Sequence, residues 1–197
     1  ADDENDVIND NLTTFTSAGI VLGQADFNTA ASGTARSGMN QPSSAAISGT
    51  KLLVLDSVNH RILIWNTMPT ENGQAADVVV GTGSAGTTQN TMSSPAGLCI
   101  AGTKLIVADT GNHRVLIWNT IPETDYANAD QVLGQMDFIS GSANRGGSAA
   151  GNTLNRPSGV WSNGTRIMVA DVYNYRVLIW NTMPTANGVA ADSVLGQ

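Results

Sequence analysis

One short stretch of sequence occurs three times in this chain, nearly unchanged. It reads DSVNHRILIWNT from Asp56, DTGNHRVLIWNT from Asp109 and DVYNYRVLIWNT from Asp171. A proline stands fourteen residues before each aspartate, a tryptophan stands nine residues after it, and a glycine follows that tryptophan by sixteen residues. A period of about fifty residues with a constant core and joints of variable length predicts a repeat architecture, in which each copy is one supersecondary unit.

The repeat divides the chain into three complete units and one partial unit. The complete units cover residues 42–81, 95–134 and 157–197. The partial unit opens with IVLGQADF at 20–27, which matches QVLGQMDF at 131–138. This match predicts a strand within 18–27, in the phase of a unit's fourth strand. Residues 1–17 form an acidic segment, which is interpreted as either a solvated tail or a segment exchanged between copies.

Within each unit the hydrophobic pattern predicts four short antiparallel strands. In the second unit an apolar run after Pro95 is followed by TKLIVAD, a turn TGNH, RVLIWNT and, after a polar loop, DQVLGQ. The central strands are apolar at consecutive positions, as in Val115 to Trp118, so we expect them to be covered on both faces. Four-stranded sheets that repeat and pack face to face are the blades of a β-propeller, and the predicted fold class is all-β.

The turn D-x-x-N-H-R between the second and third strands resembles the NHL repeat, in a form typical of bacterial proteins. The matching residues are Asp56, Asn59, His60 and Arg61; Asp109, Asn112, His113 and Arg114; and Asp171, Asn174 and Arg176, with Tyr175 in place of the third histidine. WD-type and kelch repeats fit less well, because the Gly-His pair and the Gly-Gly signature are missing. The resemblance covers residues 20–197. It implies a ring of about six blades, whereas this chain supplies three blades and one extra strand.

Three blades leave an apolar sheet face uncovered at each end. Three interpretations stay open: two copies close a six-bladed ring, copies join head to tail into a filament, or the sequence is a fragment of a longer protein. In the first two the partner is a second copy of the chain, and the strand near the N-terminus would complete a blade of its neighbour. Such an interface would bury on the order of 2,000 Å² or more.

Composition narrows the classes of partner and the location. The net charge is −7, five of the sixteen acidic residues lie in the first ten positions, and no basic patch is visible. This argues against nucleic acid, including RNA, as a partner. No stretch approaches about 18 apolar residues, so no membrane span is expected. The start at Ala1, followed by acids, suits a chain released by signal cleavage, and the sparse lysine favours an extracellular or cell-surface location in a bacterium.

The repeated turn has a structural interpretation that covers all three units. Asp109 and Arg114 flank a tight turn, so their carboxylate and guanidinium are predicted to pair across a hairpin. Asn112 is expected either to adopt the left-handed conformation or to bond the backbone through its side chain. The three repeated tryptophans, which end the third predicted strand, are interpreted as packing residues: Trp65, Trp118 and Trp180. Trp161 in the first strand of the last unit has no counterpart in the other units.

The sequence predicts that the loops between units form a binding surface. Loops 25–41, 82–94 and 136–156 vary in length and are expected to emerge on the same face as the repeated turns. The candidate binding face comprises Asn59, His60, Asn112, His113, Tyr173, Tyr175, Arg36, Arg145 and Arg156. Besides a second copy of the chain, the expected partner for this face is another surface protein or a glycan.

No catalytic residue, metal-ligand set or cofactor is predicted. His60 and His113 belong to equivalent turns of successive units, which keeps them apart, and metal ligands must converge on one ion. The two glutamates outside the tail, Glu71 and Glu123, fall in outer loops, and no Ser-His-Asp or Cys-His arrangement is evident. The predicted function is a non-enzymatic secreted or cell-surface module for self-assembly, protein binding or glycan binding. The alternative is a metal-dependent lyase or lactonase-like propeller enzyme.

Overall fold

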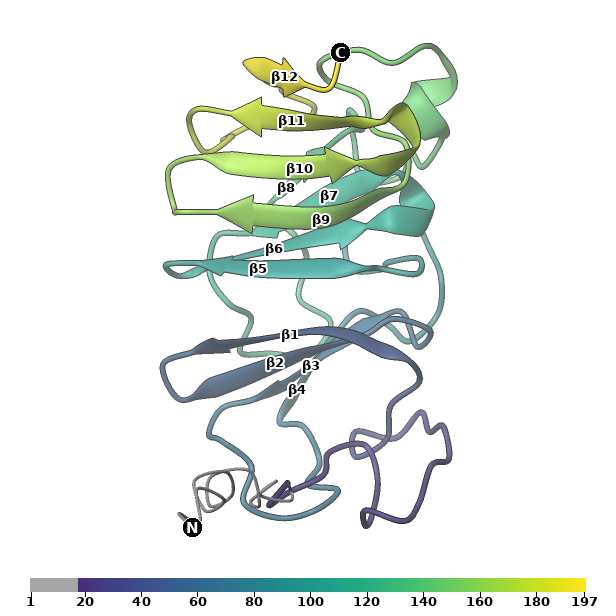
Figure 1. The fold of residues 1–197 in the computed structure, drawn as a ribbon, viewed down its shortest axis with the longest axis vertical. Helices are drawn as coiled ribbons and strands as arrows, with labels where there is room; N and C mark the ends of the chain where they lie inside the picture. Colours follow the sequence, from purple (N-terminus) through teal and green to yellow (C-terminus); the bar gives the residue numbers. More distant parts are fainter. Residues whose placement is uncertain (1–17) are drawn as a thin grey trace, which may run out of the picture.

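The structure, a computed structural model, describes residues 18–197 and consists of three four-stranded antiparallel sheets placed face to face (Figure 1). Blade 1 contains β1 (Pro42–Ser48), β2 (Lys51–Asp56), β3 (Arg61–Trp65) and β4 (Val78–Val80). Blade 2 contains β5 (Gly97–Ala101), β6 (Lys104–Asp109), β7 (Arg114–Trp118) and β8 (Gln131–Leu133). Blade 3 contains β9 (Pro157–Ser162), β10 (Ile167–Asp171), β11 (Arg176–Trp180) and β12 (Ser193–Leu195). In every sheet the strands lie side by side in chain order, which confirms the predicted all-β fold with propeller-type blades.

The acidic segment at 1–17 lies outside the described residues, and both interpretations offered for it stay predictions. The described residues also contain three short 3-10 helices: η1 (Thr110–Asn112), η2 (Ala143–Gly146) and η3 (Val172–Asn174). Within residues 18–197 no helix has the length and apolar character needed to cross a membrane.

The central strands are buried on both faces, as their unbroken apolar runs predict. In β7, Val115 and Ile117 belong to the hydrophobic cluster shared with blade 3, whereas Leu116 and Trp118 belong to the cluster shared with blade 1. Each blade therefore has an incoming face, which packs on the preceding blade, and an outgoing face, which packs on the following one. Both faces of such a strand contact apolar side chains, so its residues need not alternate between apolar and polar.

The first strands of the blades, β1, β5 and β9, lie next to one another along one side of the stack (Figure 1). Gly97 in β5 shows how close this approach is, because a Cβ atom added there would stand 2.3 Å from the carbonyl oxygen of Ser158 in β9. A glycine is required where two backbones come this near.

The predicted strand within 18–27 is wrong as secondary structure, since these residues form no strand. They nevertheless lie against the incoming face of blade 1. The N–H of Val21 donates to Oδ1 of Asn72 at 2.9 Å, and the N–H of Gly73 donates to the carbonyl oxygen of Val21 at 2.9 Å. Leu22 and Met39 pack on the hydrophobic cluster of that face.

The same pair of hydrogen bonds recurs at both joints between blades. They connect Val79 of β4 to Asp125 and Tyr126, and Val132 of β8 to Asn187 and Gly188. Residues 20–24 therefore occupy the position of a fourth strand of a blade that would precede blade 1. They are not a strand because a strand needs a hydrogen-bonded neighbour, and none of the described residues supplies the third strand of that blade.

Candidate functional site

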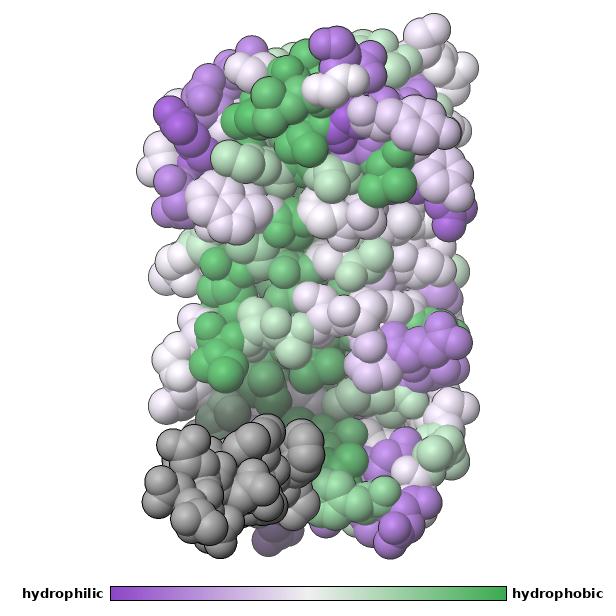
Figure 2. All heavy atoms as spheres, in the orientation of Figure 1, coloured by the Kyte–Doolittle hydropathy of each residue, from purple (hydrophilic) through white to green (hydrophobic). Residues whose placement is uncertain are grey.

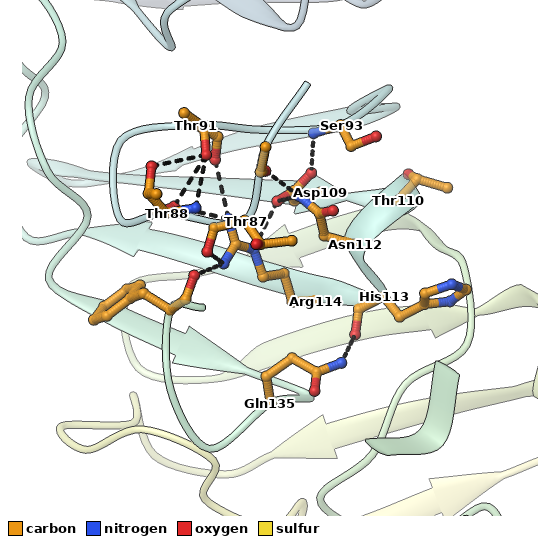
Figure 3. A network of polar contacts seen from close by, with 12 residues as sticks. Thr87, Thr88, Thr91, Ser93, Asp109, Thr110, Asn112, His113, Arg114 and Gln135 are labelled. Carbon is orange, nitrogen blue, oxygen red and sulfur yellow. Dashed lines mark hydrogen bonds and ion pairs between the residues drawn. The ribbon is translucent and has the colours of Figure 1, made fainter. Parts of the chain in front are cut away.

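The repeated aspartate is the centre of a buried polar network in each blade, and Figure 3 shows the network of blade 2. In blade 2, Oδ2 of Asp109 accepts hydrogen bonds from Nε of Arg114 at 2.7 Å and from Nδ2 of Asn112 at 2.8 Å. Oδ1 accepts the N–H of Ser93 at 2.6 Å. The side chains of Asp109 and Arg114 are fully buried.

The guanidinium of Arg114 reaches beyond its partner carboxylate. Its terminal nitrogens donate to the carbonyl oxygens of Thr87, Thr88, Thr91 and Phe138 at 2.5–3.2 Å. The side chain thereby fastens the loop that enters blade 2, and Phe138 of the loop that leaves it, onto the turn between β6 and β7 (Figure 3). The charged network thus holds the backbone of these loops in position.

Blades 1 and 3 repeat this arrangement. The equivalent contacts join Asp56 to Asn59 and Arg61, and Asp171 to Asn174 and Arg176, at 2.7–2.8 Å. The structural interpretation of the repeated turn is confirmed. The inclusion of two asparagines in the binding face is wrong, because Asn59 and Asn112 are only 7% and 6% exposed and are occupied by internal hydrogen bonds.

Burial raises the pKa of the Asp109 carboxyl above its ordinary value, and the Arg114 guanidinium, the Ser93 N–H and the Asn112 amide oppose that rise. These donors favour the charged form of the carboxyl against the effect of burial, since an unpaired buried charge would be strongly destabilised. The network thus depends on all of its members.

The left-handed residue of the turn is the histidine position, and not the asparagine. The φ angle is 53° at His60 and at His113 and 56° at Tyr175. Histidine tolerates positive φ better than most residues other than glycine, asparagine and aspartate. The asparagine side chain instead holds the aspartate of its own turn.

The two histidines connect successive blades. Nδ1 of His60 accepts the N–H of Ser94 at 2.9 Å, and Nδ1 of His113 accepts the N–H of Arg156 at 3.0 Å. Each donor, Ser94 or Arg156, directly precedes the proline at the start of the following blade, Pro95 or Pro157. An imidazole that accepts through Nδ1 must be unprotonated there, so these bonds need neutral histidine.

A hydroxyl adds a second bond at each joint. Oγ of Ser57 donates to the carbonyl of Pro95, and Oγ1 of Thr110 donates to the carbonyl of Pro157, both at 2.6 Å. Blade 3 departs from the pattern at both positions. Blade 3 has Val172 and Tyr175 at these positions, and both residues are exposed. The outgoing side of the last blade therefore lacks the two polar groups that join the others.

The stability of the blade 2–blade 3 joint should depend on the protonation of His113. Burial lowers the pKa of His113 from its ordinary value near 6.5, and the positive charge of Arg156 lowers it further. The unfolded chain then binds more protons than the folded one below about pH 6.5, so the stabilisation is complete above that pH and is lost as pH falls through the lowered pKa. Urea unfolding between about pH 5 and pH 8 measures this slope.

The matched variant for this measurement is His113→Gln, which carries no titratable group. We expect it to show a smaller rise of the unfolding free energy with pH than the parent chain. The lowered pKa values of the Asp125 and Asp137 carboxyls place their own effects at more acidic pH. An equal slope in the parent and in the variant would contradict the assignment to His113.

The repeated tryptophans are packing residues, as predicted. Trp65, Trp118 and Trp180 are at most 2% exposed. Each donates its Nε1–H to a backbone carbonyl nine residues further along, at 3.0–3.1 Å. Trp161 differs, since it lies on β9 and its side chain is 49% exposed.

The three arginines of the candidate face are used in different ways. Arg36 forms an ion pair with Asp125 and donates to the carbonyl of Asp77 at 2.7 Å. Arg145 donates to the carbonyls of Gly134 and Gly188 at 3.2 and 3.3 Å, which ties two loops together. These two side chains therefore act within the chain.

What remains exposed of the candidate face lies at blade 3. The guanidinium of Arg156 stands over the ring of Tyr173 at 5.2 Å, and Tyr173 and Tyr175 are 58% and 85% exposed. The structure does bring the variable loops together with the repeated turns, since the turn arginines bind loop carbonyls. However, the nine candidate residues do not form one surface. Some are buried inside a blade, some contact the next blade or loop, and some belong to this aromatic group.

Groups with chemical reactivity are sparse in the described part of the chain. No group of three or more histidine, cysteine, aspartate or glutamate side chains there is arranged to hold a metal ion. Glu71 is exposed, and the carboxylate of Glu123 lies 3.6 Å from Nζ of Lys51. Burial raises the pKa of the Cys99 thiol, which favours its unreactive protonated form.

Sequence reasoning missed the backbone bonds of the valines at the joints. A signal for them exists, because Asn72, Asp125 and Asn187 each stand seven residues after the repeated tryptophan. A side-chain oxygen kept at one position of every repeat indicates a repeated acceptor. Its donor lies in the preceding unit, and the sequence alone does not identify it.

The repeat is also found when the chain is compared with known protein families. The family model of the NHL repeat matches residues 92–118, which include β5, β6, the turn and β7. The chain therefore contains an NHL repeat, and its three sheets are consistent with NHL-type propeller blades. No curated protein matches the chain.

Two solved structures show a distant likeness. One is a functionally unknown protein from Desulfotomaculum acetoxidans DSM 771, with 16% identity and a TM-score of 0.46 over 79% of this chain and 42% of that one. The other is a chain in a humanized mutant of the Chaetomium thermophilum Polycomb Repressive Complex 2 bound to the inhibitor GSK126. It has 11% identity and a TM-score of 0.44 over 71% of this chain and 28% of that one. The chain thus spans less than half the length of either.

Proposed function

We propose that this chain, which carries an NHL repeat within three propeller-type blades, is a non-enzymatic self-assembly module that acts through the outgoing face of blade 3. The observation that carries the proposal is a difference in burial between equivalent residues. Val115 and Ile117 of β7 are completely buried by blade 3, whereas their equivalents in β11, Val177 and Ile179, are partly exposed. Leu195 of β12 is 58% exposed.

This face has the composition of a blade joint and not of a solvated sheet. Val177, Ile179 and Leu195 alternate with residues of the other face, so their apolar side chains lie on one surface. Figure 2 shows hydrophobic residues gathered at the end of the molecule that holds β11 and β12. Contiguous apolar surface of this kind marks an association site in a folded protein.

The same module is proposed to work outside the cell or at its surface, on the compositional grounds given above. Tyr175 is 85% exposed and occupies the position at which His60 and His113 contact the following blade, so it would enlarge the contact of the outgoing face with a partner. Tyrosine and arginine are enriched at binding surfaces because they combine a large apolar area with a polar end. Tyr175 is therefore part of the proposed interface.

Light scattering of the full chain over a range of concentrations tests the proposal. We expect a mass of at least twice the chain mass of 20.4 kDa, and Ile179→Lys should restore the monomer because it places a charge in the centre of the contact. Ile139→Lys is the matched control, since Ile139 is 75% exposed on a loop of blade 2. A folded parent chain that stays monomeric at the highest concentration would refute self-assembly.

A further inference from the structure

The two ends of the molecule carry the same sequence at the same structural position. Residues 21–24 and residues 194–197 both read VLGQ. The first stretch lies on blade 1 where a preceding fourth strand would lie. The second begins in β12, which is the fourth strand of blade 3. A full blade 3 of one copy and residues 20–24 of another would therefore compete for one place.

We propose that the chain associates by strand exchange, with residues 20–24 of a second copy replacing β12 on β11. The proposal rests on the proposed self-assembly and specifies its contact. In the isolated chain, β12 pairs with β11 so that Leu195 is opposite Val177 and Ser193 is opposite Ile179. The shared VLGQ sequence gives the register of the exchanged strand, with Leu22 opposite Val177 and Ile20 opposite Ile179.

In the part of the chain that the structure describes, the donated segment already lies in the position that the exchange requires. The outward-facing N–H and carbonyl of Val21 are already bound to Asn72 and Gly73 of its own blade 1. Within residues 18–197 no hydrogen bond engages the backbone of Ile20 or Leu22, the neighbours that would face β11. The equivalent outward bonds of Val79 likewise leave β4 paired with β3. Blade 1 of the donor would then follow blade 3 of the acceptor as blade 3 follows blade 2.

Displacement of β12 from β11 costs little buried surface. The strand has three residues, all of them exposed, while the equivalent β4 is at most 5% exposed at every position. The incoming strand carries Ile20 in place of Ser193, so it adds an apolar side chain beside Ile179. Burial of that added apolar area favours the exchanged form.

The joint between copies would differ from the internal joints in one respect. At blade 3 the joint histidine and hydroxyl are replaced by Tyr175 and Val172, so neither of the two interblade hydrogen bonds forms in the same way. We therefore expect assemblies to dissociate on dilution while the three blades of one chain stay together.

A disulfide that locks β12 in place tests strand exchange separately from assembly. In a Cys99→Ser background, Ile179→Cys and Ser193→Cys place two thiols directly opposite each other on β11 and β12. Opposed residues of antiparallel strands have Cα atoms about 5 Å apart, within the range of a disulfide. We expect the oxidised variant to be monomeric and the reduced variant to regain the mass of the Cys99→Ser parent.

The outcomes separate the two ideas. An oxidised, locked variant that assembles as the parent does would overturn strand exchange and leave self-assembly standing. A parent that never assembles would overturn both.

Hydrogen exchange on the unmodified chain provides a second measurement, in case the cysteine variant does not fold or does not assemble when reduced. On assembly the amides of 20–22 should exchange more slowly by about tenfold or more, and those of 193–195 should exchange faster. Unchanged protection of 193–195 in the assembled protein would also overturn the exchange.

Discussion

Replacing Arg114 by methionine should lower the free energy of unfolding by about 3–5 kcal/mol, the range measured when one partner of a buried ion pair is removed. The substitution leaves the Asp109 carboxylate buried with its amide donors alone. It also removes the donors of four loop carbonyls. Domains of this size are stable by about 5–15 kcal/mol, so the loss would be a large part of the total.

Urea unfolding followed by circular dichroism measures the effect, and Arg176→Met is the matched control. Arg176 makes the same contact to its aspartate at 2.8 Å but donates to only two loop carbonyls. Its smaller network and its place in the terminal blade predict a smaller loss. Equal losses in the two variants would show that the loop carbonyls contribute nothing beyond the ion pair.

The turn network also explains which part of the fold the sequence makes predictable. The repeat spacing places Asp109, Arg114 and Trp118 in one unit, and local rules then supply the hairpin, the ion pair and the burial of the strand. These features form within about ten residues of one another. Their chemistry is therefore readable from a single copy, and the three copies make the pattern hard to mistake.

The joints were predicted less well, because their partners lie in different units. The repeat pattern assigns His113 either a structural or surface role or a place on the candidate binding face, but it does not reveal that Nδ1 accepts the N–H of Arg156 from the next blade's entry loop. Residues 20–24 match a fourth strand in sequence, but strand formation depends on a third strand supplied from elsewhere. The residues next to a side chain in the sequence do not identify its partner in another unit. The proposed interface consists of contacts between units, so it could not be predicted in the same way.

Replacing Trp118 by alanine should cost about 3–5 kcal/mol of unfolding free energy, the range for large-to-small changes at buried aromatic residues. Its indole is 2% exposed in the hydrophobic cluster between blades 1 and 2. The Nε1–H donor to the carbonyl of Ala127 would be lost with it. The cavity would open in a joint between two blades, so the substitution should weaken the packing of one blade on the next as well as the blade itself.

Trp161→Ala is the control for this prediction, since it removes the same side chain from a position that is 49% exposed on β9. Surface substitutions usually change stability by about 0.5 kcal/mol or less, and a half-exposed indole should cost somewhat more than that. Circular dichroism in urea is preferred to fluorescence because both variants lose an emitter. If Trp161→Ala proved as costly as Trp118→Ala, an exposed side chain of a first strand would contribute as much to stability as one buried in a joint. The stability of the chain would then not reside chiefly between its blades.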